Sequence, residues 1–173
     1  METFEKNNSM ETPLLMLDKL AGHILEDRAL QWGKKNVLHN EEIVTSLDTM
    51  LKSTTKVSTE DEALVSFFVF RYGFNYLNDV QKQKAKNLVD QNITKFPVFK
   101  KLENDFIAIQ KIITQNGEKL ILDKHSNPIA NKLVAMEIKR INVDLNRPEL
   151  ENKHLSISFK ELPNKQLELS LEK

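Results

Sequence analysis

The stretch ALVSFFVFRYGFNYL, residues 63–77, decides how the first half of this chain folds. It holds six of the twelve aromatic side chains in the sequence: Phe67, Phe68, Phe70, Tyr72, Phe74 and Tyr76. Thr59 and Glu62 stand before it at the spacing of a capping box, which predicts that a helix starts there. Four structures suit so many aromatics: a membrane contact, a stacking surface for nucleic acid, a ligand pocket, or the centre of a core.

A membrane contact and a stacking strand are the weaker alternatives. Ser66, Arg71 and Asn75 interrupt the apolar run, so it is too short and too polar to span a bilayer. An interfacial helix would carry more basic residues along one face. As a strand, the stretch would place alternate aromatics on one face, as single-strand binders do. It lacks the full pattern of the aromatic RNA-binding strands, and the helical patterns around it do not fit their fold.

As a helix, the stretch is apolar on nearly all sides, which is typical of a buried central helix. Arg71, Asn75 and Asn78 form its one narrow polar strip, and they are the candidate contacts to a partner or ligand. A buried Arg71 would need an anionic partner, either a carboxylate of the protein or a bound ligand. Ser66 and Gly73, seven positions apart, would let one neighbouring helix approach closely. A sharper alternative is that part of this helix stays open as a partner groove or an apolar pocket.

Apolar residues at helical spacing predict four further helices, so that the five together cover about 12–32, 40–51, 59–77, 78–93 and 97–114. After Gly117 the apolar period changes from 3.6 to 2, which indicates strands. EKLILD predicts one strand, and residues 155–159 and 167–171 predict a hairpin joined by ELPNK. Residues 129–145 fit both periods; we expect a short helical start after Pro128 and a strand at about 136–145.

These elements predict an α+β protein, with an N-terminal bundle of about five helices followed by a small antiparallel sheet that ends in a C-terminal hairpin. We expect residues 1–11 to be disordered, 12–116 to form the bundle, and 117–173 to form the sheet packed on it as one domain. One face of the sheet should be buried and the other wet. The C-terminal strand is expected to be an edge strand that can pair with another chain.

Composition excludes several classes of function. The chain has no cysteine, which rules out thiol catalysis, disulfides and cysteine-based zinc sites. Its 25 basic residues balance 25 acidic ones, so no general attraction to nucleic acid or to anionic lipid is predicted. A chain rich in Lys and Asn and poor in Arg is what an AT-rich genome encodes, which suggests a bacterial, plasmid or viral source. The polar N-terminus and the lack of a long apolar run predict a cytoplasmic protein without a membrane span, with signal-independent export as the alternative.

No motif identifies a known family, a catalytic centre, a metal site or a cofactor, and none is predicted. His23 and Glu26 have a spacing that metal-binding bundles use in pairs, but no second pair exists. Trp32, the single tryptophan, would cover a core edge or anchor an interface. A locally basic region follows the aromatic stretch and comprises Lys82, Lys84, Lys86, Lys95, Lys100 and Lys101. It indicates either a solvated helix face or a patch for an acidic protein or nucleic acid.

The sequence therefore favours a non-enzymatic protein-interaction module, such as an adaptor, a chaperone-like partner, an effector or an immunity-type protein. The expected partner is another protein or a second copy, bound through the C-terminal edge strand or an apolar helix face. One alternative is a small nucleic-acid-associated regulator that uses the lysines, although balanced charge makes nucleic acid the less favoured partner. The other is a small ligand-binding protein or an enzyme whose site residues are dispersed along the chain.

Overall fold

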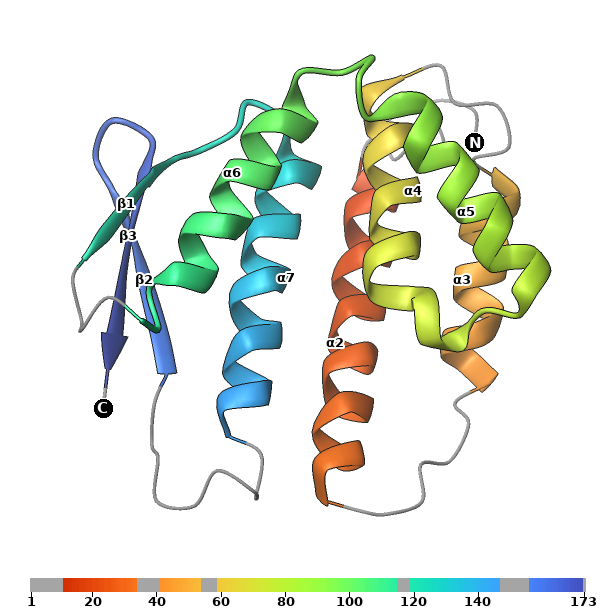
Figure 1. Cartoon of the computed structure of the whole chain (residues 1–173), viewed down its shortest axis with the longest axis horizontal. Helices are drawn as coiled ribbons and strands as arrows, with labels where there is room; N and C mark the ends of the chain where they lie inside the picture. The colour runs from red at the N-terminus through yellow and green to blue at the C-terminus, as the bar shows by residue number, and fades with distance from the viewer. Residues whose placement is uncertain (1–10, 34–40, 54–58, 115–118, 147–155, 173) are drawn as a thin grey trace. The chain divides into compact units, whose positions relative to one another are not determined.

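The chain is mostly helical, with a small three-stranded antiparallel sheet near its C-terminus (Figure 1). This confirms the predicted α+β class. The computed structural model describes residues 11–33, 41–53, 59–114, 119–146 and 156–172. The disorder predicted for residues 1–11 falls almost wholly outside these ranges. Within them the chain forms six α-helices and one short 3₁₀ helix.

The chain forms two compact units. The first consists of Met1–Ile24 and Leu38–Pro97, and the second of Leu25–Val37 and Val98–Lys173. Helix α2 (Glu11–Gly33) contributes residues to both units. The last of the five predicted helices groups with the strands in the second unit.

In the first unit, capping bonds form at the starts of two helices, and the one at Thr59 is the cap that the sequence predicts. Helix α3 (Glu41–Ser53) is followed by α4 (Glu60–Gly73) and α5 (Asp79–Asn92). The Glu62 backbone N–H donates to Thr59 Oγ1 at 3.2 Å. Asn78 and Gln81 donate backbone N–H groups to each other's side chains at 2.9 and 2.8 Å, which completes a capping box. Because these bonds satisfy N–H groups that a helix start leaves without partners, they fix where α4 and α5 begin.

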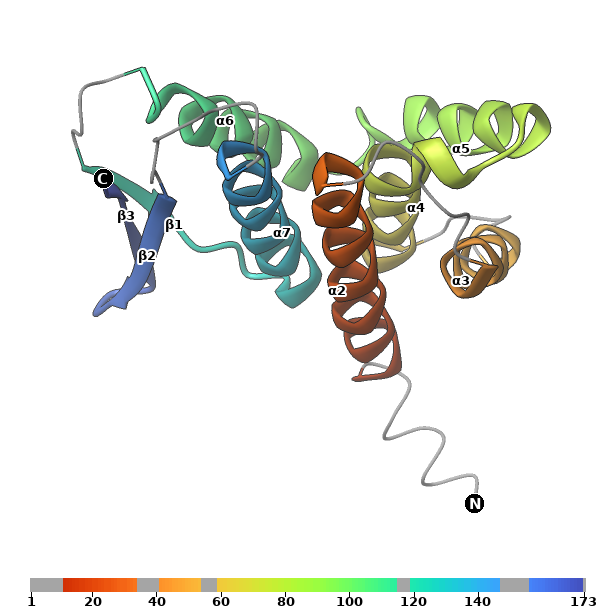
Figure 2. The ribbon, with the colours of Figure 1, turned by 90° about the horizontal axis from the view of Figure 1, so that it is seen from below.

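Helix α4 is the central element of the first unit. It packs against both α3 and α5, and Figure 2 shows α5 running beside it. Its buried residues lie on nearly all sides of the helix: Ala63, Leu64, Val65, Ser66, Phe68, Val69, Tyr72 and Gly73. The prediction of a buried core helix is confirmed for residues 63–73. Arg71 is exposed, so the pairing predicted for a buried arginine is not required of it.

The prediction that this helix continues to residue 77 is wrong. Helix α4 ends at Gly73, and a 3₁₀ helix, η1 (Phe74–Tyr76), follows. The chain has to leave the α4 axis before Asn78 caps α5, and Leu77 makes this change with extended backbone, φ −96° and ψ 148°. Leu77 stays buried, but Phe74 leaves the buried face and is 40% exposed.

Gly73 lets α3 approach α4 closely, as its position in the sequence predicts. A Cβ atom at Gly73 would lie 2.6 Å from Leu47 Cδ2 and 2.8 Å from Leu47 Cδ1. Leu47 is fully buried, so its side chain has little room to move. Gly22 on α2 is different, because a Cβ atom there would meet nothing within 4 Å.

Gly73→Ala is expected to lower the free energy of unfolding by about 1–3 kcal/mol, because the added methyl group overpacks the contact with Leu47. Gly22→Ala is the matched control and is expected to raise it by about 0.5–1 kcal/mol, since alanine is the better helix former. Urea denaturation of both variants measures the difference. Equal stability of the two variants would show that Leu47 moves aside at no cost.

In the second unit, two helices cover one face of the sheet. Helix α6 (Val98–Lys111) packs against α7 (Pro128–Leu145), and each helix contacts an outer strand (Figure 2). The strands are β1 (Leu120–Asp123), β2 (Ser156–Leu162) and β3 (Gln166–Glu172). The apolar stripe predicted for α6 is buried at Phe99, Leu102, Phe106 and Ile109.

Residues 128–145 form one helix, so the strand predicted at about 136–145 is wrong. Asn127 caps this helix by accepting from the Ile129 backbone N–H at 2.8 Å, and Pro128 occupies its first position. The polar residues Asn142 and Asp144 produce the alternation that suggested a strand, but they are not the solvent-facing positions of one. Their side chains bind groups on neighbouring elements, which the sequence alone does not reveal.

The C-terminal strand is central, so the prediction that it forms an edge is wrong. The order is β1–β3–β2, and β3 pairs antiparallel with both neighbours. Both of its edges are therefore used within the sheet. The predicted burial of one face is confirmed: Leu122, Leu167 and Leu169 are buried, whereas Ile121 on the opposite face is 52% exposed.

Asn142 protects the free edge of β2. Its side-chain amide donates to the Ile157 carbonyl at 3.0 Å and accepts from the Ile157 N–H at 2.7 Å. A residue of an added strand would make the same two bonds. One helix side chain thus occupies a position at which another chain would otherwise pair.

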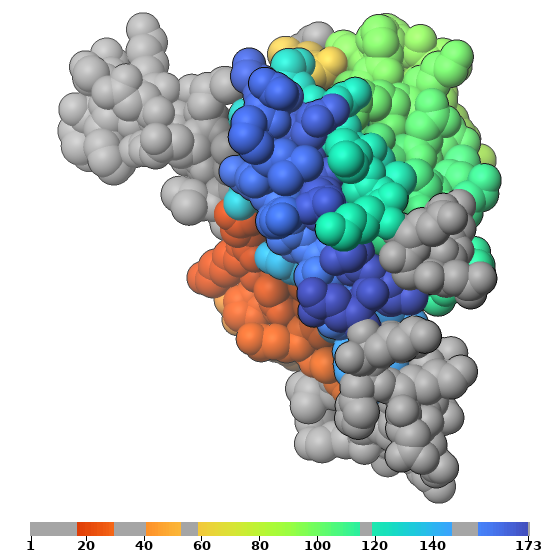
Figure 3. All heavy atoms as spheres, turned by 90° about the vertical axis from the view of Figure 1, so that its left-hand side faces the viewer, coloured from red at the N-terminus to blue at the C-terminus, as the bar shows by residue number. Residues whose placement is uncertain are grey.

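The outer face of the sheet carries a ladder of charges. Figure 3 views this side, with the blue atoms of β2 and β3 next to the teal atoms of β1. Glu168 Oε2 lies 3.2 Å from Lys160 Nζ, and Glu168 Oε1 lies 3.4 Å from Lys119 Nζ. The hydrogen bond from Lys160, followed by that from Lys119, holds the pKa of Glu168 below its ordinary value, against the opposing effect of burial.

A lowered pKa in the folded state means that Glu168 stabilises the protein above its ordinary pKa of 4.5, and that this contribution is lost as the pH falls. Glu168→Gln is expected to flatten the loss of stability below that pH. Thermal melting temperatures between pH 6 and pH 3 measure the effect, with exposed Glu103 changed to Gln as the control. A Glu168→Gln profile parallel to that of the wild type would contradict this role.

Candidate functional site

A groove between α3, η1 and the start of α5 brings together two of the predicted site residues, Asn75 and Asn78. Its volume is about 510 Å³. We call it the α3–α5 groove; its lining residues are Val44, Thr45, Asp48, Asn75, Tyr76, Leu77, Asn78 and Gln81. The turn that ends α4 at Gly73 creates it, because η1 carries Asn75 and Tyr76 away from the helix axis. The polar strip predicted along one helix is thereby divided between a 3₁₀ turn and a helix cap.

Asp48 is the charged residue among those that line the groove. Its Oδ2 lies 2.9 Å from Lys52 Nζ, and its Oδ1 accepts from Gln81 Nε2 at 2.8 Å. The hydrogen bond from Lys52, and then that from Gln81, holds the pKa of Asp48 below its ordinary value. The carboxylate therefore stays ionised at neutral pH, and its bond to Gln81 connects α3 to the capping box of α5.

An exposed aromatic side chain is adjacent to Asn75 in the chain. Phe74 meets Phe70 edge-on, with ring centroids 5.6 Å apart. Lys82 Nζ lies 4.8 Å from the centroid of the Phe74 ring, which is cation–π geometry. These contacts orient Phe74 while leaving 40% of it exposed, so it is an ordered aromatic surface residue.

Arg71 is not among the described residues that line the groove. The Arg71 guanidinium carbon lies 5.7 Å from the ring centroid of its neighbour Tyr72. The Trp32 side chain lies outside the described residues, so its predicted role stays a prediction.

The six lysines of the predicted basic patch lie in two units. Lys82 contacts Phe74, Lys84 lines an open hollow along α5, and Lys86 pairs with Asp90 at 2.7 Å. Lys95 is exposed. Lys100 and Lys101 belong to the second unit, where Lys101 binds Asp105 at 3.0 Å. Contacts with aromatic and acidic groups thus engage three of the six.

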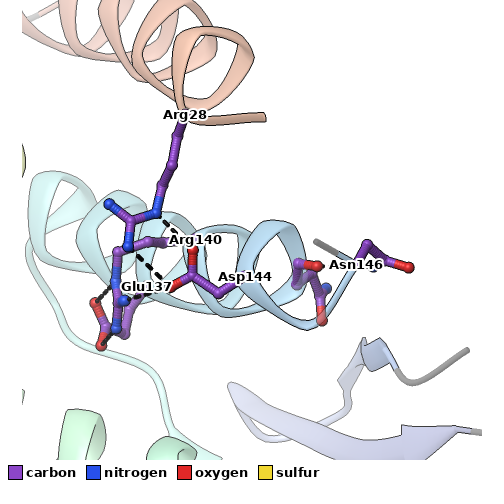
Figure 4. Close-up of polar contacts among 6 residues, drawn as sticks. Arg28, Glu137, Arg140, Asp144 and Asn146 are labelled. Atoms are coloured by element: carbon purple, nitrogen blue, oxygen red, sulfur yellow. Dashed lines mark hydrogen bonds and ion pairs between the residues drawn. The ribbon is translucent and has the colours of Figure 1, made fainter. Parts of the chain in front are cut away.

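The second unit holds a charge cluster that sequence analysis missed. Figure 4 shows Arg28 of α2 reaching towards Asp144 of α7, beside Glu137 and Arg140. Arg28 donates to both oxygens of Asp144 at 2.6 and 3.0 Å. Arg140 donates to Asp144 at 3.1 Å and to Glu137 at 2.8 Å, and Glu137 is fully buried. Two arginines balance two carboxylates, so the cluster ties α7 to residues 25–33 of α2.

A second buried polar network holds the connection before α7. His125 Nε2 lies 2.7 Å from Asp105 Oδ2, and both side chains are buried. Asn131 accepts from the His125 N–H and donates to the His125 carbonyl, both at 2.9 Å. The spacing of Glu137, Arg140 and Asp144 at i, i+3 and i+7 was a signal for the first cluster. No local spacing pointed to His125 and Asp105, which lie 20 positions apart.

Comparisons with family models, curated proteins and solved structures gave no match to this chain. Among the described residues, no helix is both long enough and apolar enough to cross a membrane. The chemistry of the α3–α5 groove is therefore inferred from the residues that line it. It offers one ionised carboxylate, several amides and hydroxyls, and an apolar floor, which is a surface suited to recognition.

The pair Arg28–Asp144 is expected to contribute about 1–2 kcal/mol of coupling free energy, because it is bidentate and partly buried. A double-mutant cycle with Arg28→Ala and Asp144→Ala, followed by urea denaturation, measures it. The exposed pair Lys86–Asp90 is the control, with an expected coupling of about 0.3–0.5 kcal/mol. Additive effects of the two changes would mean that the cluster does not hold α7 to α2.

Proposed function

We propose that this protein is a non-enzymatic protein-interaction module that holds a segment of a partner protein in the α3–α5 groove. The observation that supports this most is the combination in the groove of ionised Asp48 and the amide of Asn75, with the exposed ring of Phe74 next to Asn75 in the chain. Amides and hydroxyls bind peptide groups, and ordered aromatic side chains are common anchors at protein interfaces.

The groove favours a partner segment that carries a basic residue near an apolar one. Asp48 is already paired with Lys52, but 73% of the Lys52 side chain is exposed. A lysine or arginine of a partner can take its place at little cost, since exposed ion pairs are weak. The apolar residue of the partner would meet Phe74 or the floor formed by Val44 and Leu77.

The chemistry of the groove supports binding over catalysis. An acid–base catalyst works best with a pKa near the operating pH, whereas the Lys52 and Gln81 bonds move the pKa of Asp48 the other way. The described residues that line the groove include hydroxyls at Thr45 and Tyr76 but no imidazole to activate them. We propose a cytoplasmic location and an AT-rich bacterial, plasmid or viral source on the composition alone.

The alternative function, a nucleic-acid-associated regulator, can be tested separately. It expects Lys82→Glu/Lys84→Glu to weaken binding to DNA or RNA, and the binding to weaken steeply with salt. No binding at low salt would remove it. The contacts that Lys82, Lys86 and Lys101 already make reduce the charge available to phosphates, and so favour the protein-interaction proposal.

Selection of random twelve-residue peptides displayed on phage tests the proposed function. We expect the wild-type protein to enrich peptides with Lys or Arg near an apolar residue. Asp48→Asn should weaken the enriched peptides about tenfold or more, because it removes the charge while keeping the shape. Phe74→Ala should weaken them as well. Calorimetry with the synthetic peptides gives the dissociation constants.

Asp90→Asn is the matched control, since Asp90 also pairs with a lysine four positions away but is not among the described lining residues of the groove. It should leave the affinity unchanged. Peptides that bind all three variants as tightly as the wild type would place the binding elsewhere, and a failure to enrich any peptide would overturn the proposal.

A further inference from the structure

A second pocket in the first unit contains a histidine whose inner ring nitrogen is unused. The pocket lies between α2 and α3 and has a volume of about 230 Å³. We call it the His23 pocket; its lining residues are Lys19, Leu20, His23, Glu42, Ser46 and Met50. It shares no described lining residue with the α3–α5 groove, so it is a separate candidate site.

The Nε2 atom of His23 is buried and has no hydrogen-bond partner among the described residues. Glu42 Oε1 lies 3.7 Å away, which is beyond hydrogen-bond distance. Buried polar atoms in folded proteins nearly always have a partner, so an unsatisfied one calls for a missing water, ion or ligand. The gap between His23 and Glu42 is where that partner would lie.

The charges in the pocket indicate what kind of ligand fits. Lys19 Nζ lies 3.9 Å from the same Glu42 oxygen, so one cation and one anion stand side by side at the pocket. A ligand with a single charge would be repelled by whichever of these two side chains carries the same charge. Leu20 and Met50 are almost fully buried and supply an apolar wall. The set therefore offers a carboxylate, an ammonium group, an imidazole and an apolar surface together.

A metal ion suits the pocket less well. The described residues contain no group of three or more His, Asp or Glu side chains that could hold one. A bare cation bound at Glu42 would also be repelled by the Lys19 ammonium group, because it brings no negative charge of its own to offset that repulsion.

We propose that the His23 pocket binds a small zwitterion of the amino-acid class. The ligand's ammonium group would bind Glu42, its carboxylate would bind Lys19 and His23 Nε2–H, and its short apolar side chain would lie on Leu20 and Met50. A neutral zwitterion keeps the pocket neutral and gives the buried nitrogen its partner. The volume is below the roughly 300–1,000 Å³ of pockets for drug-sized ligands, which suits a molecule of this size.

Titration of the full ¹⁵N-labelled chain with free L-leucine and L-methionine, followed by NMR, tests the proposal. Resonances of α2 and α3 around residues 19–23 and 42–50 should shift. N-acetyl-L-leucine lacks the ammonium group and L-leucinamide lacks the carboxylate, so each should bind about tenfold more weakly or not at all. Equal binding of L-leucine, N-acetyl-L-leucine and L-leucinamide would overturn the zwitterion assignment.

Two variants locate the site. His23→Ala and Glu42→Gln should each raise the dissociation constant about tenfold or more, because each removes one polar partner of the ligand. Glu42 is 59% exposed at its side chain, so its variant should fold even if His23→Ala does not. Lys95→Ala, on an exposed position of the same unit, is the control and should bind like the wild type.

No shifts with any of these compounds would mean that a water molecule alone fills the gap, and would overturn the proposal. Shifts that both variants leave unchanged would place the binding elsewhere, with the same consequence. The outcome is separate from that of the peptide selection, because Asp48 and Phe74 are not among the described residues that line the His23 pocket.

Discussion

The packing of α3 against Gly73 of α4 is the contact on which the first unit depends. Helix α4 buries residues on nearly all sides, so its neighbours have to approach within van der Waals distance everywhere along it. At Gly73 the side chain of Leu47 occupies the space that a Cβ atom would need. Gly73 is also the last residue of α4, and the 3₁₀ turn that follows places Asn75 and Tyr76 beside α3. Close packing and the groove thus have one origin.

The second unit relies on polar side chains of α7 in place of a small residue. Asn142 binds the backbone of β2, and Asp144 binds Arg28. Glu137 is fully buried and is neutralised by Arg140. Buried charges of this kind cost free energy unless they are paired, so their main effect is to specify which groups α7 must face.

The two candidate sites differ in whether their polar groups already have partners within the protein. In the α3–α5 groove Asp48 is already bound to Lys52 and Gln81, and a partner would exchange places with the exposed Lys52. In the His23 pocket a buried nitrogen lacks a partner among the described residues, so a ligand would complete the arrangement. The first arrangement suits a weak and reversible contact with a polypeptide. The second suits a small molecule that fills a defined space.

The sequence by itself determined the elements whose signals are local. The capping residues Thr59 and Asn78, the apolar stripe of α6 and the alternation of the hairpin strands each specify structure over a few positions. The sequence also singled out Gly73 and the polar pair Asn75 and Asn78, because a small or polar residue on an apolar helix is conspicuous. At 129–145 the sequence fitted both a helix and a strand, because the polar residues Asn142 and Asp144 bind partners that are distant in the chain.

Tertiary structure alone decided which elements meet. The C-terminal strand became central because β1, from more than forty positions earlier in the chain, pairs with its free side. His23 met Glu42, and His125 met Asp105, through packing between different helices and loops. The groove exists because the chain turns at Gly73, and the position of α3 closes its other side. Local sequence fixes backbone preferences and caps, whereas such contacts depend on the free energy of packing the whole unit.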